Sequence, residues 1–462
     1  MKFKTISRYF LIVNLLPGFS LICSAQEWKW AVKLNTGNTV YDMAVDNTGN
    51  AYLATGERST IQKFDSRGNL IWAKSGESIS FSRGLAIDQK NNLYVAGHGY
   101  HSIWDGQNTN HIRQTEGLCL YVMKLDGNGK IIWSTTLPKS GSFSAYDIEV
   151  DLEGSIYVHG GLSGYNTFLT KLNEDGTEAW YKILTGLNYT AGHGALGLDA
   201  QGNCYVTSDY GTNWYPKSSL TAKFDKAGNK LWEIIKNETM SRGIAVRPDG
   251  SFLIASTMSG GITKYDNTGA YVWNDGVIIP AGLDVELDAE NNFYGVGSNY
   301  TNTIGCPVIA GWNEEGRAMW NIILDCKGAS SADFVKSARI DATCYIAGSF
   351  INSLFIAGTN LESSAKTIYL GRLDCSFSRL NAGKSKLFPN PLIERSVLNF
   401  DNKENEIYTL KIFDARGQLI RSLNNIMTGS IIIERGNLHE GAYFYLLSDR
   451  SKRVDAGKFV VY

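Results

Sequence analysis

The pattern of apolar and polar positions repeats along most of this 462-residue chain. Short segments in which apolar and polar residues alternate, as in half-buried strands, are separated by turns that contain Asp or Asn and Gly. In the first repeat these segments are 30–34, 41–45, 50–56 and 60–64. The same unit of four segments recurs about every fifty residues, and this period indicates a repeat architecture in which each unit forms one small sheet.

One segment of the unit is repeated most clearly, and each of its six complete copies ends in Trp. A seventh copy breaks off before its Trp, and the missing residue is found at the other end of the chain as Trp30. We therefore predict an all-β fold, a seven-bladed β-propeller over residues 26–380, in which the segment around Trp30 completes the last blade and hides both sheet edges. The copies are 63–72, 124–133, 171–180, 223–232, 264–273 and 311–320, with 371–374 as the fragment.

The turns and the strand pattern indicate which strand of each predicted blade is innermost and which is outermost. Turns such as 46–50 and 65–69 begin with Asp and have Gly three residues later, a pattern that caps the turn amides and supplies a positive φ. Calcium binding by these Asp residues is the alternative, but the alternating Asp ladder of a calcium loop is absent. Small residues such as Ala44 and Ala86 between two apolar positions predict the innermost strand, and the Trp segment is then outermost.

These motifs resemble known propeller repeats. The K-x-D-x-x-G-x-x-x-W segment is similar to the tryptophan-docking motif of quinoprotein-type propellers, with one residue fewer between Asp and Gly. The G-N-x-Y-V-x-G phrase, as in 91–97 and 154–160, resembles the bacterial β-propeller repeat family (SBBP). The resemblance implies the fold and leaves the function open, since such propellers include enzymes and binding scaffolds. Quinoprotein dehydrogenases would imply eight blades and a vicinal Cys pair, which this chain lacks, so we expect no cofactor.

The first 25 residues predict a signal peptide. A basic start, an apolar stretch and the small residues Ser24 and Ala25 have the order of a secretory leader. No later stretch approaches the ~20 apolar residues of a membrane span. The formal net charge of −1 gives no reason to expect a nucleic-acid partner.

Six Cys remain after cleavage of the predicted signal peptide, and their pairing is left open. Cys204 and Cys344 lie on equivalent strands, and we expect them to be buried core residues.

A different pattern follows a linker at 381–386. Residues 387–462 closely resemble the type A C-terminal sorting domain of the type IX secretion system, which implies export across both membranes of a Bacteroidota cell. An ordinary small β-sandwich is the alternative. We therefore expect the type IX machinery as a partner and the cell surface or the medium as the destination. The matching residues are Phe388, Pro389, Asn390, Pro391, Asp414, Gly417, Leu438, Gly441, Tyr443, Gly457 and Lys458.

Two of the four connections in each blade are long and variable, and variable loops on a rigid scaffold commonly carry function. The segment 97–117 holds three of the six His residues together with aromatic and acidic residues, but no metal-ligand spacing, so we expect no metal. A solvated polar loop is the simpler interpretation, and stacking of exposed aromatic rings on sugars is the functional one. The candidate ligand-binding residues are Tyr100, His101, Trp104, His111, Trp214, Tyr215 and Tyr300.

A second candidate site lies where the predicted inner strands converge. Carboxylates at the mouth of an axial channel could bind a cation or perform acid–base chemistry on a polysaccharide, and a water-filled polar channel is the simpler alternative. The candidates are Asp42, Asp147, Glu149, Asp284 and Glu286, with Arg339 aligned to the Glu position.

The sequence thus predicts an exported, non-enzymatic binding module for a glycan or a surface protein. The alternative is a secreted carbohydrate-active hydrolase or lyase with its site at the channel mouth. A purely structural surface-layer component is a third possibility. No Ser/His/Asp set or Gly-rich phosphate loop stands out in the sequence.

Overall fold

The computed structural model describes residues 28–461 with internal gaps, and every statement below concerns these described residues. The residues outside the description are 1–27, 35–38, 57–59, 76–79, 100–118, 138–142, 163–165, 185–193, 211–217, 238, 259–260, 276–278, 280, 289–290, 302–303, 314–315, 317, 327–330, 339–342, 375–385, 389–391, 393, 401–406, 416, 429, 449–452 and 462. The predicted signal peptide, residues 1–25, therefore lies outside them. The described residues form two compact units, one up to Asp374 and one from Lys386.

The first unit contains seven antiparallel sheets in its described part, and six of them have four strands in consecutive order. The all-β fold class is confirmed. The strands of the first three sheets are β2 (Val40–Val45), β3 (Ala51–Thr55), β4 (Thr60–Phe64), β5 (Leu70–Lys74); β6 (Ser80–Ile87), β7 (Leu93–Gly99), β8 (Cys119–Leu125), β9 (Ile131–Leu137); and β10 (Phe143–Val150), β11 (Ile156–Leu162), β12 (Asn166–Leu172), β13 (Glu178–Leu184). The next three are β14 (Gly194–Leu198), β15 (Cys204–Tyr210), β16 (Ser218–Phe224), β17 (Lys230–Asn237); β18 (Thr239–Val246), β19 (Phe252–Met258), β20 (Gly261–Tyr265), β21 (Tyr271–Asp275); and β22 (Ala281–Leu287), β23 (Phe293–Thr301), β24 (Ile304–Trp312), β25 (Ala318–Ile323).

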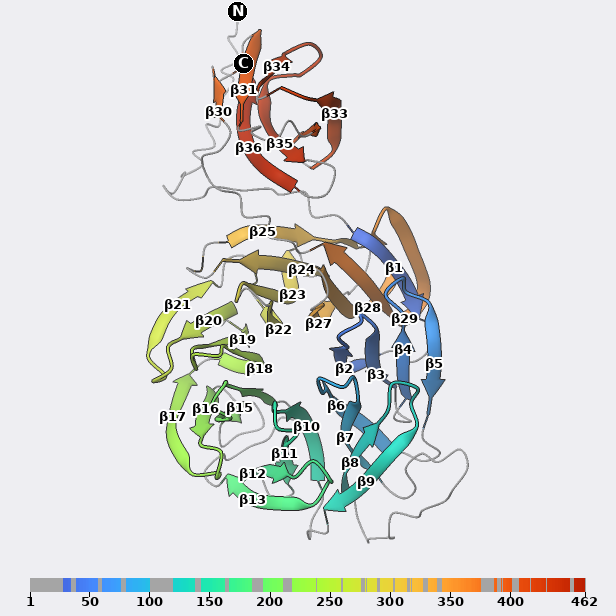
Figure 1. Cartoon of the computed structure of the whole chain (residues 1–462), viewed down its shortest axis with the longest axis vertical. Coiled ribbons are helices and arrows are strands. Elements are labelled where there is room, and N and C mark those ends of the chain that lie inside the picture. The colour runs from blue at the N-terminus through green and yellow to red at the C-terminus, as the bar shows by residue number, and fades with distance from the viewer. Residues whose placement is uncertain are drawn as a thin grey trace, which may run out of the picture. The chain divides into compact units, whose positions relative to one another are not determined.

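The seventh sheet joins the two ends of the propeller. It contains β26 (Asp325–Cys326), β27 (Ser331–Ala338), β28 (Thr343–Ile356), β29 (Thr359–Asp374) and the N-terminal strand β1 (Trp28–Leu34). Strand β1 pairs antiparallel with β29, with Trp30 opposite Arg372, as predicted for closure. The sheets stand around a central axis, with β2, β6, β10, β18, β22 and β27 innermost and β1, β5, β9, β13, β17, β21 and β25 at the rim (Figure 1). Strand β14 contacts both β10 and β18.

At four of the blade junctions a tryptophan of the rim donates a hydrogen bond to a turn of the next blade. Trp30 donates its indole N–H to the carbonyl of Ser66 at 3.0 Å, and Trp72 does the same to Gly127 at 3.3 Å. Trp133 and Trp180 repeat this contact with the turns of the third and fourth blades. In all four contacts the acceptor is the residue after the Asp or Asn that opens the turn, so one sequence motif produces the same inter-blade contact at these four junctions.

The glycine of the same turn is required by this packing. Gly68 has a φ of +86°, and a Cβ built on it would lie 2.9 Å from the Trp30 ring. Gly129, Gly176 and Gly228 also have positive φ and leave 3.0–3.2 Å between such a Cβ and their neighbours on the preceding blade. A side chain at these positions would strain the backbone and push the indole away.

In the first four blades and in the seventh, a tyrosine of the second strand supports the docked tryptophan. Tyr52 meets the Trp72 ring edge to face at 6.0 Å, and its hydroxyl lies 3.1 Å from Asp46. Lys63 lies over the Tyr52 ring at 4.9 Å and forms a 3.7 Å ion pair with Asp46. This arrangement recurs in the second and fourth blades, so the Lys, Asp, Tyr and Trp of the repeat form one interlocked set.

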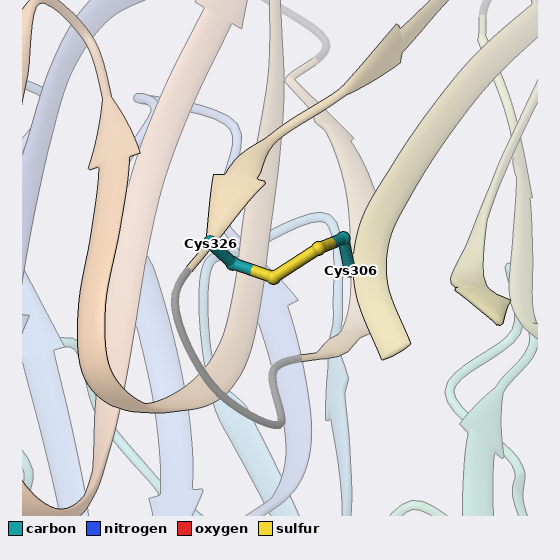
Figure 2. Close-up of a disulfide and its surroundings, with 2 residues drawn as sticks. All are labelled: Cys306 and Cys326. Carbon is teal, nitrogen blue, oxygen red and sulfur yellow. A yellow bond between two sulfur atoms is a disulfide. The ribbon is translucent and has the colours of Figure 1, made fainter. Parts of the chain in front are cut away.

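The junction between the sixth and seventh blades departs from this pattern. The seventh copy of the docking segment has Phe377 where the other six have Gly. At this junction a disulfide joins Cys306 of β24 to Cys326 of β26, with Cα atoms 5.9 Å apart (Figure 2). The bridge links the two sheets covalently. The side chains of Cys204 and Cys344 are fully buried, as predicted.

Two histidines are buried in the propeller. His159 is completely buried, and its Nδ1 donates to the Phe168 carbonyl at 2.9 Å, so its Nε2 accepts the hydroxyl of Ser208 at 2.7 Å. His98 is 5% exposed and stacks on Phe81 with ring centroids 5.3 Å apart. Burial lowers the pKa of each to about 4, with a further contribution at His98 from the charge of Arg83.

The second unit contains two sheets that share one core. The sheets are β30 (Lys386–Phe388), β31 (Arg395–Asn399), β34 (Ser430–Glu434) and β32 (Tyr408–Phe413), β33 (Leu419–Ile426), β35 (Gly441–Ser448), β36 (Arg453–Val461). Leu398 and Ile433 of the first sheet and Leu410, Leu447 and Phe459 of the second belong to the same buried cluster.

The motif residues of this unit have structural roles where they are described. Asp414 accepts hydrogen bonds from the backbone N–H groups of the turn, and Gly417 has a φ of +80°. Tyr443 stacks on Phe459, and a Cβ on Gly457 would meet the Tyr445 ring. Phe388 lies in β30, Gly441 begins β35 and Lys458 is exposed in β36, whereas Pro389, Asn390 and Pro391 are outside the described residues.

We predict that the double variant Cys306→Ser with Cys326→Ser loses about 3 kcal/mol of unfolding free energy, because the unfolded chain regains the entropy of a closed loop. Urea titration with and without dithiothreitol checks this. Reduction is expected to bring the wild type to the value of the variant and to leave the variant unchanged. Equal stability of oxidised wild type, reduced wild type and variant would show that the bridge contributes nothing.

We also predict that the propeller loses stability as the pH falls from 7 to 4. In the unfolded chain a histidine takes up its proton near pH 6.5, whereas the folded chain resists protonation of His98 and His159 down to about pH 4. The stabilisation is therefore complete above pH 7 and is lost on acidification, by up to about 3 kcal/mol for each histidine. Replacing both with Gln should flatten urea midpoints measured between pH 7.5 and 5; an unchanged slope would refute the assignment.

Candidate functional site

The topology separates short turns from variable connections. Consecutive strands of each blade are antiparallel, so the Asp/Gly turns leave at one end of the blade. The connection between the second and third strands and the connection to the next blade leave at the opposite end. We call this end of the ring the variable face. The start of every inner strand and the end of every second strand lie at it.

A β-bulge interrupts six of the seven inner strands near the variable face. Each bulge leaves one residue without a partner on the second strand, and such residues are commonly re-aimed at a functional site. In β14, which is described from Gly194, the register runs without a shift. The bulged residues are Tyr41, Arg83, Tyr146, Arg242, Leu283 and Asp333.

The inner strands enclose a hollow of about 120 Å³ on the axis, which we call the axial pocket. All seven blades contribute to its wall. Four of the bulged residues line it, together with carboxylates of the first, third and sixth blades. The lining residues are Tyr41, Asp42, Arg83, Tyr146, Asp147, Glu149, Gly194, Ala195, Leu196, Arg242, Gly243, Ile244, Asp284 and Phe334.

Two of the lining carboxylates connect neighbouring blades. Asp42 accepts the backbone N–H of Met43 at 2.7 Å and that of Leu85, on the next inner strand, at 2.6 Å. Asp147 likewise accepts from Ile148 of its own strand and from Leu196 of the next blade, both at 2.8 Å. These carboxylates hold the ring together at its centre, so their side chains are fixed.

Arg83 lies in an aromatic setting. Its guanidinium carbon is 4.7 Å from the centroid of the Tyr41 ring and 5.6 Å from that of Phe81. These cation–π contacts hold the side chain without using its N–H donors. The buried Nε of Arg83 has no hydrogen-bond partner among the described residues.

Arg242 is fixed by a buried ion pair. Its Nη1 donates to Asp209 Oδ2 at 3.0 Å, and the Asp209 side chain is fully buried. Burial raises the pKa of Asp209, and the neighbouring guanidinium opposes that shift. The second guanidinium nitrogen, Nη2, has a described contact only with the sulfur of Met240, at 3.9 Å. Arg242 therefore retains donor capacity at the pocket.

The Tyr146 ring packs against His159, which is hydrogen-bonded to Ser208. Its ring meets His159 edge to face with centroids 5.7 Å apart, and its hydroxyl occupies the space a Cβ on Gly161 would need. A Cβ on Gly194 would lie 2.7 Å from His159 Nε2. The His159–Ser208 pair thus lies directly behind the pocket wall and supports Tyr146 from below.

The structure brings together some of the predicted site residues. Asp42, Asp147, Glu149 and Asp284 line the axial pocket. Glu286 accepts the N–H of Leu287 at 3.1 Å and is not among the described lining residues. Of the predicted ligand-binding aromatics, Tyr300 lies in β23 and its side chain is not described. The predictions that lie outside the described residues are Tyr100, His101, Trp104, His111, Trp214 and Tyr215.

Arg339 lies outside the described residues, and the described register gives the position that was predicted for it to Lys336. Glu149 and Glu286 pair with Tyr157 and Tyr294, and the equivalent Tyr345 pairs with Lys336. The seventh inner strand therefore runs three residues earlier than its apolar pattern indicated. The interpretation of 97–117 as a solvated loop was also wrong for its first residues, because His98 is a buried residue of β7.

The sequence reasoning missed the four bulged side chains of the pocket. Tyr41, Arg83, Tyr146 and Arg242 each precede the Asp or Gly of the inner strand, and this shared offset was the available signal. A bulge places an unexpected residue on the inner side, so strict alternation assigns it to the wrong face.

Two further kinds of feature are absent from the described residues. No group of three or more His, Cys, Asp or Glu side chains there has the arrangement of a metal site. No helix in the described part is long and apolar enough to cross a membrane.

One known structure supports the propeller fold. A streptogramin B lyase superposes with a TM-score of 0.51 at 14% identity, over 74% of this chain and 97% of the lyase. The WD40 β-propeller domain of Doa1 gives a TM-score of 0.48 at 12% identity, over 77% and 98% of the two chains. At such identities the first likeness shows the fold alone. An uncharacterized WD repeat-containing protein of Acanthamoeba polyphaga mimivirus is 28% identical over 116 residues, which are 23% of this chain and 8% of that protein.

The C-terminal unit has a family match. Residues 386–462 match the secretion system C-terminal sorting domain. The resemblance to the type IX sorting domain is thereby confirmed, and recognition by the type IX machinery follows from it. The chain is a β-propeller protein that carries a type IX sorting domain and is exported to the cell surface or the medium.

Proposed function

We propose that the exported propeller is a binding module whose ligand, a glycan or a surface protein, enters at the variable face and is anchored in the axial pocket. The observation that carries the proposal is the row of bulges, which turns two Tyr and two Arg side chains toward one hollow. A pocket with aromatic walls and a few fixed polar groups is the usual form of a small-ligand site.

The carboxylates favour binding over catalysis. A catalytic acid or base must exchange a proton with the substrate, whereas Asp42 and Asp147 already accept backbone N–H groups of two strands each. Substituting them would loosen the ring. Glu149 also lines the pocket. It is the carboxylate on which the alternative function, a hydrolase or lyase, would depend.

We predict that chain 26–462 captures at least one glycan class on a polysaccharide and glycan array and releases no product from it. Tyr146→Ala should weaken capture by about 1–3 kcal/mol, the range for an aromatic anchor. Tyr271→Ala, which removes an exposed tyrosine of the rim strand β21, is the matched control and should have no effect.

Two results would contradict this function. Product release by the wild type that is abolished in Glu149→Gln would make the protein an enzyme. Capture that is equally strong in the wild type and in Tyr146→Ala would remove the axial pocket from the site. Binding of a purified surface protein, with no glycan captured, would select the protein branch of the proposal.

A further inference from the structure

We infer that the axial pocket takes one neutral, polyhydroxylated ring, such as the terminal sugar of a glycan. The inference rests on the proposed binding function and names the chemical class of the group held at the axis.

Hydrogen-bond acceptors and donors alternate around the axis. The first blade supplies the carboxylate of Asp42 and the second the guanidinium of Arg83; the third supplies Glu149, the fifth Arg242 and the sixth Asp284. A hydroxyl group both donates and accepts, so a ring with several hydroxyls can meet both kinds of partner. An anion would face the carboxylates of three blades, and an ammonium group would face two guanidinium groups.

The partners are held in place before any ligand arrives. Arg83 is packed on Tyr41 and Phe81, and Arg242 is paired with the buried Asp209. Because these side chains are already ordered, binding a ring costs little side-chain entropy.

Unused donor capacity is present at two points of the pocket wall. The buried Nε of Arg83 has no partner among the described residues, and a buried donor without a partner is rare in folded proteins. The described contact of Arg242 Nη2 is a long one to sulfur. A planar guanidinium can donate two parallel hydrogen bonds, and neighbouring hydroxyls on a ring offer acceptors at a suitable spacing.

The size and the apolar parts of the wall fit a single ring. The pocket volume of about 120 Å³ is close to the ~150 Å³ of a cavity that holds benzene, so the pocket can take in one edge of a single sugar ring and no more. Tyr41, Tyr146 and Phe334 supply aromatic surface for the C–H face of a sugar. A chain of sugars would not fit, so the end of a glycan is the part we expect to be held.

The test is saturation-transfer NMR and calorimetry on chain 26–462 with a panel of single sugars. The panel contains neutral hexoses and N-acetylhexosamines together with the uronic acid and amino sugar of the same ring configuration. At least one neutral sugar should bind at least tenfold more tightly than its uronate and amine counterparts. Its affinity should be insensitive to salt, because no net charge is recognised.

A variant pair tests the guanidinium geometry. Arg83→Lys keeps the charge and removes the planar fork, and should weaken the neutral sugar at least tenfold. Arg67→Lys, at an exposed turn of the opposite face, should leave the affinity unchanged. Thermal unfolding of both variants shows whether a loss of sugar affinity comes from misfolding. The selectivity among sugars is measured on the wild type and does not depend on any variant.

The outcomes separate this inference from the function on which it rests. Preferred binding of the uronate or the amine would overturn the neutral-ring assignment. Capture of a glycan on the array, with no single sugar bound and no effect of Arg83→Lys, would refute the inference and leave the binding function standing. Absence of both glycan capture and sugar binding would refute both.

Discussion

The docking of a tryptophan ring on the turn of the next blade is the contact on which the rest of this molecule depends. A sheet of four strands cannot bury both of its faces alone, and each blade here gains its cover from its neighbours. The indole of Trp72 reaches the carbonyl of Gly127 and packs beside Gly129, and the same hydrogen bond is formed at three further junctions. Through Trp30 the contact also joins the N-terminal strand of the last blade to the first blade.

Ring closure in turn creates the site. The axial pocket forms only where the blades meet, because its lining consists of one or a few residues from each of seven inner strands. Asp42 and Asp147 tie these strands together in pairs, so the position of the bulged side chains depends on the ring being complete. A binding site built this way is rigid, and variation in the loops around it can change the ligand without disturbing the scaffold.

Much of the fold could be predicted from the sequence because the same strand and turn motif occurs in several repeats. The Trp, Asp and Gly of one motif predicted the rim strand, the turn and the closure by Trp30. The site could be predicted only in part. Asp42 and Asp147 were identified by their alignment, but the bulges that expose Arg83 and Arg242 break the alternation on which strand predictions rest.

Two other features were beyond sequence reasoning for different reasons. The seventh inner strand has Phe334 and Lys336 where other blades have small or acidic residues, so its register could not be read from composition. The pairing of Cys306 with Cys326 depends on β26 lying beside the sixth blade, which no spacing rule reveals. The sorting domain, in contrast, was identified by short motifs with fixed roles, such as the turn at Asp414 and Gly417.

The most direct test of the account compares two glycine substitutions by chemical unfolding. Gly68 and Gly358 both have positive φ, +86° and +72°, but a Cβ on Gly68 meets the Trp30 ring and a Cβ on Gly358 meets nothing within 4 Å. Gly358→Ala should cost about 1–2 kcal/mol from backbone strain alone. Gly68→Ala should cost about 1–3 kcal/mol more, because the closing indole is displaced. Equal losses in the two variants would contradict the claim that tryptophan docking closes the ring.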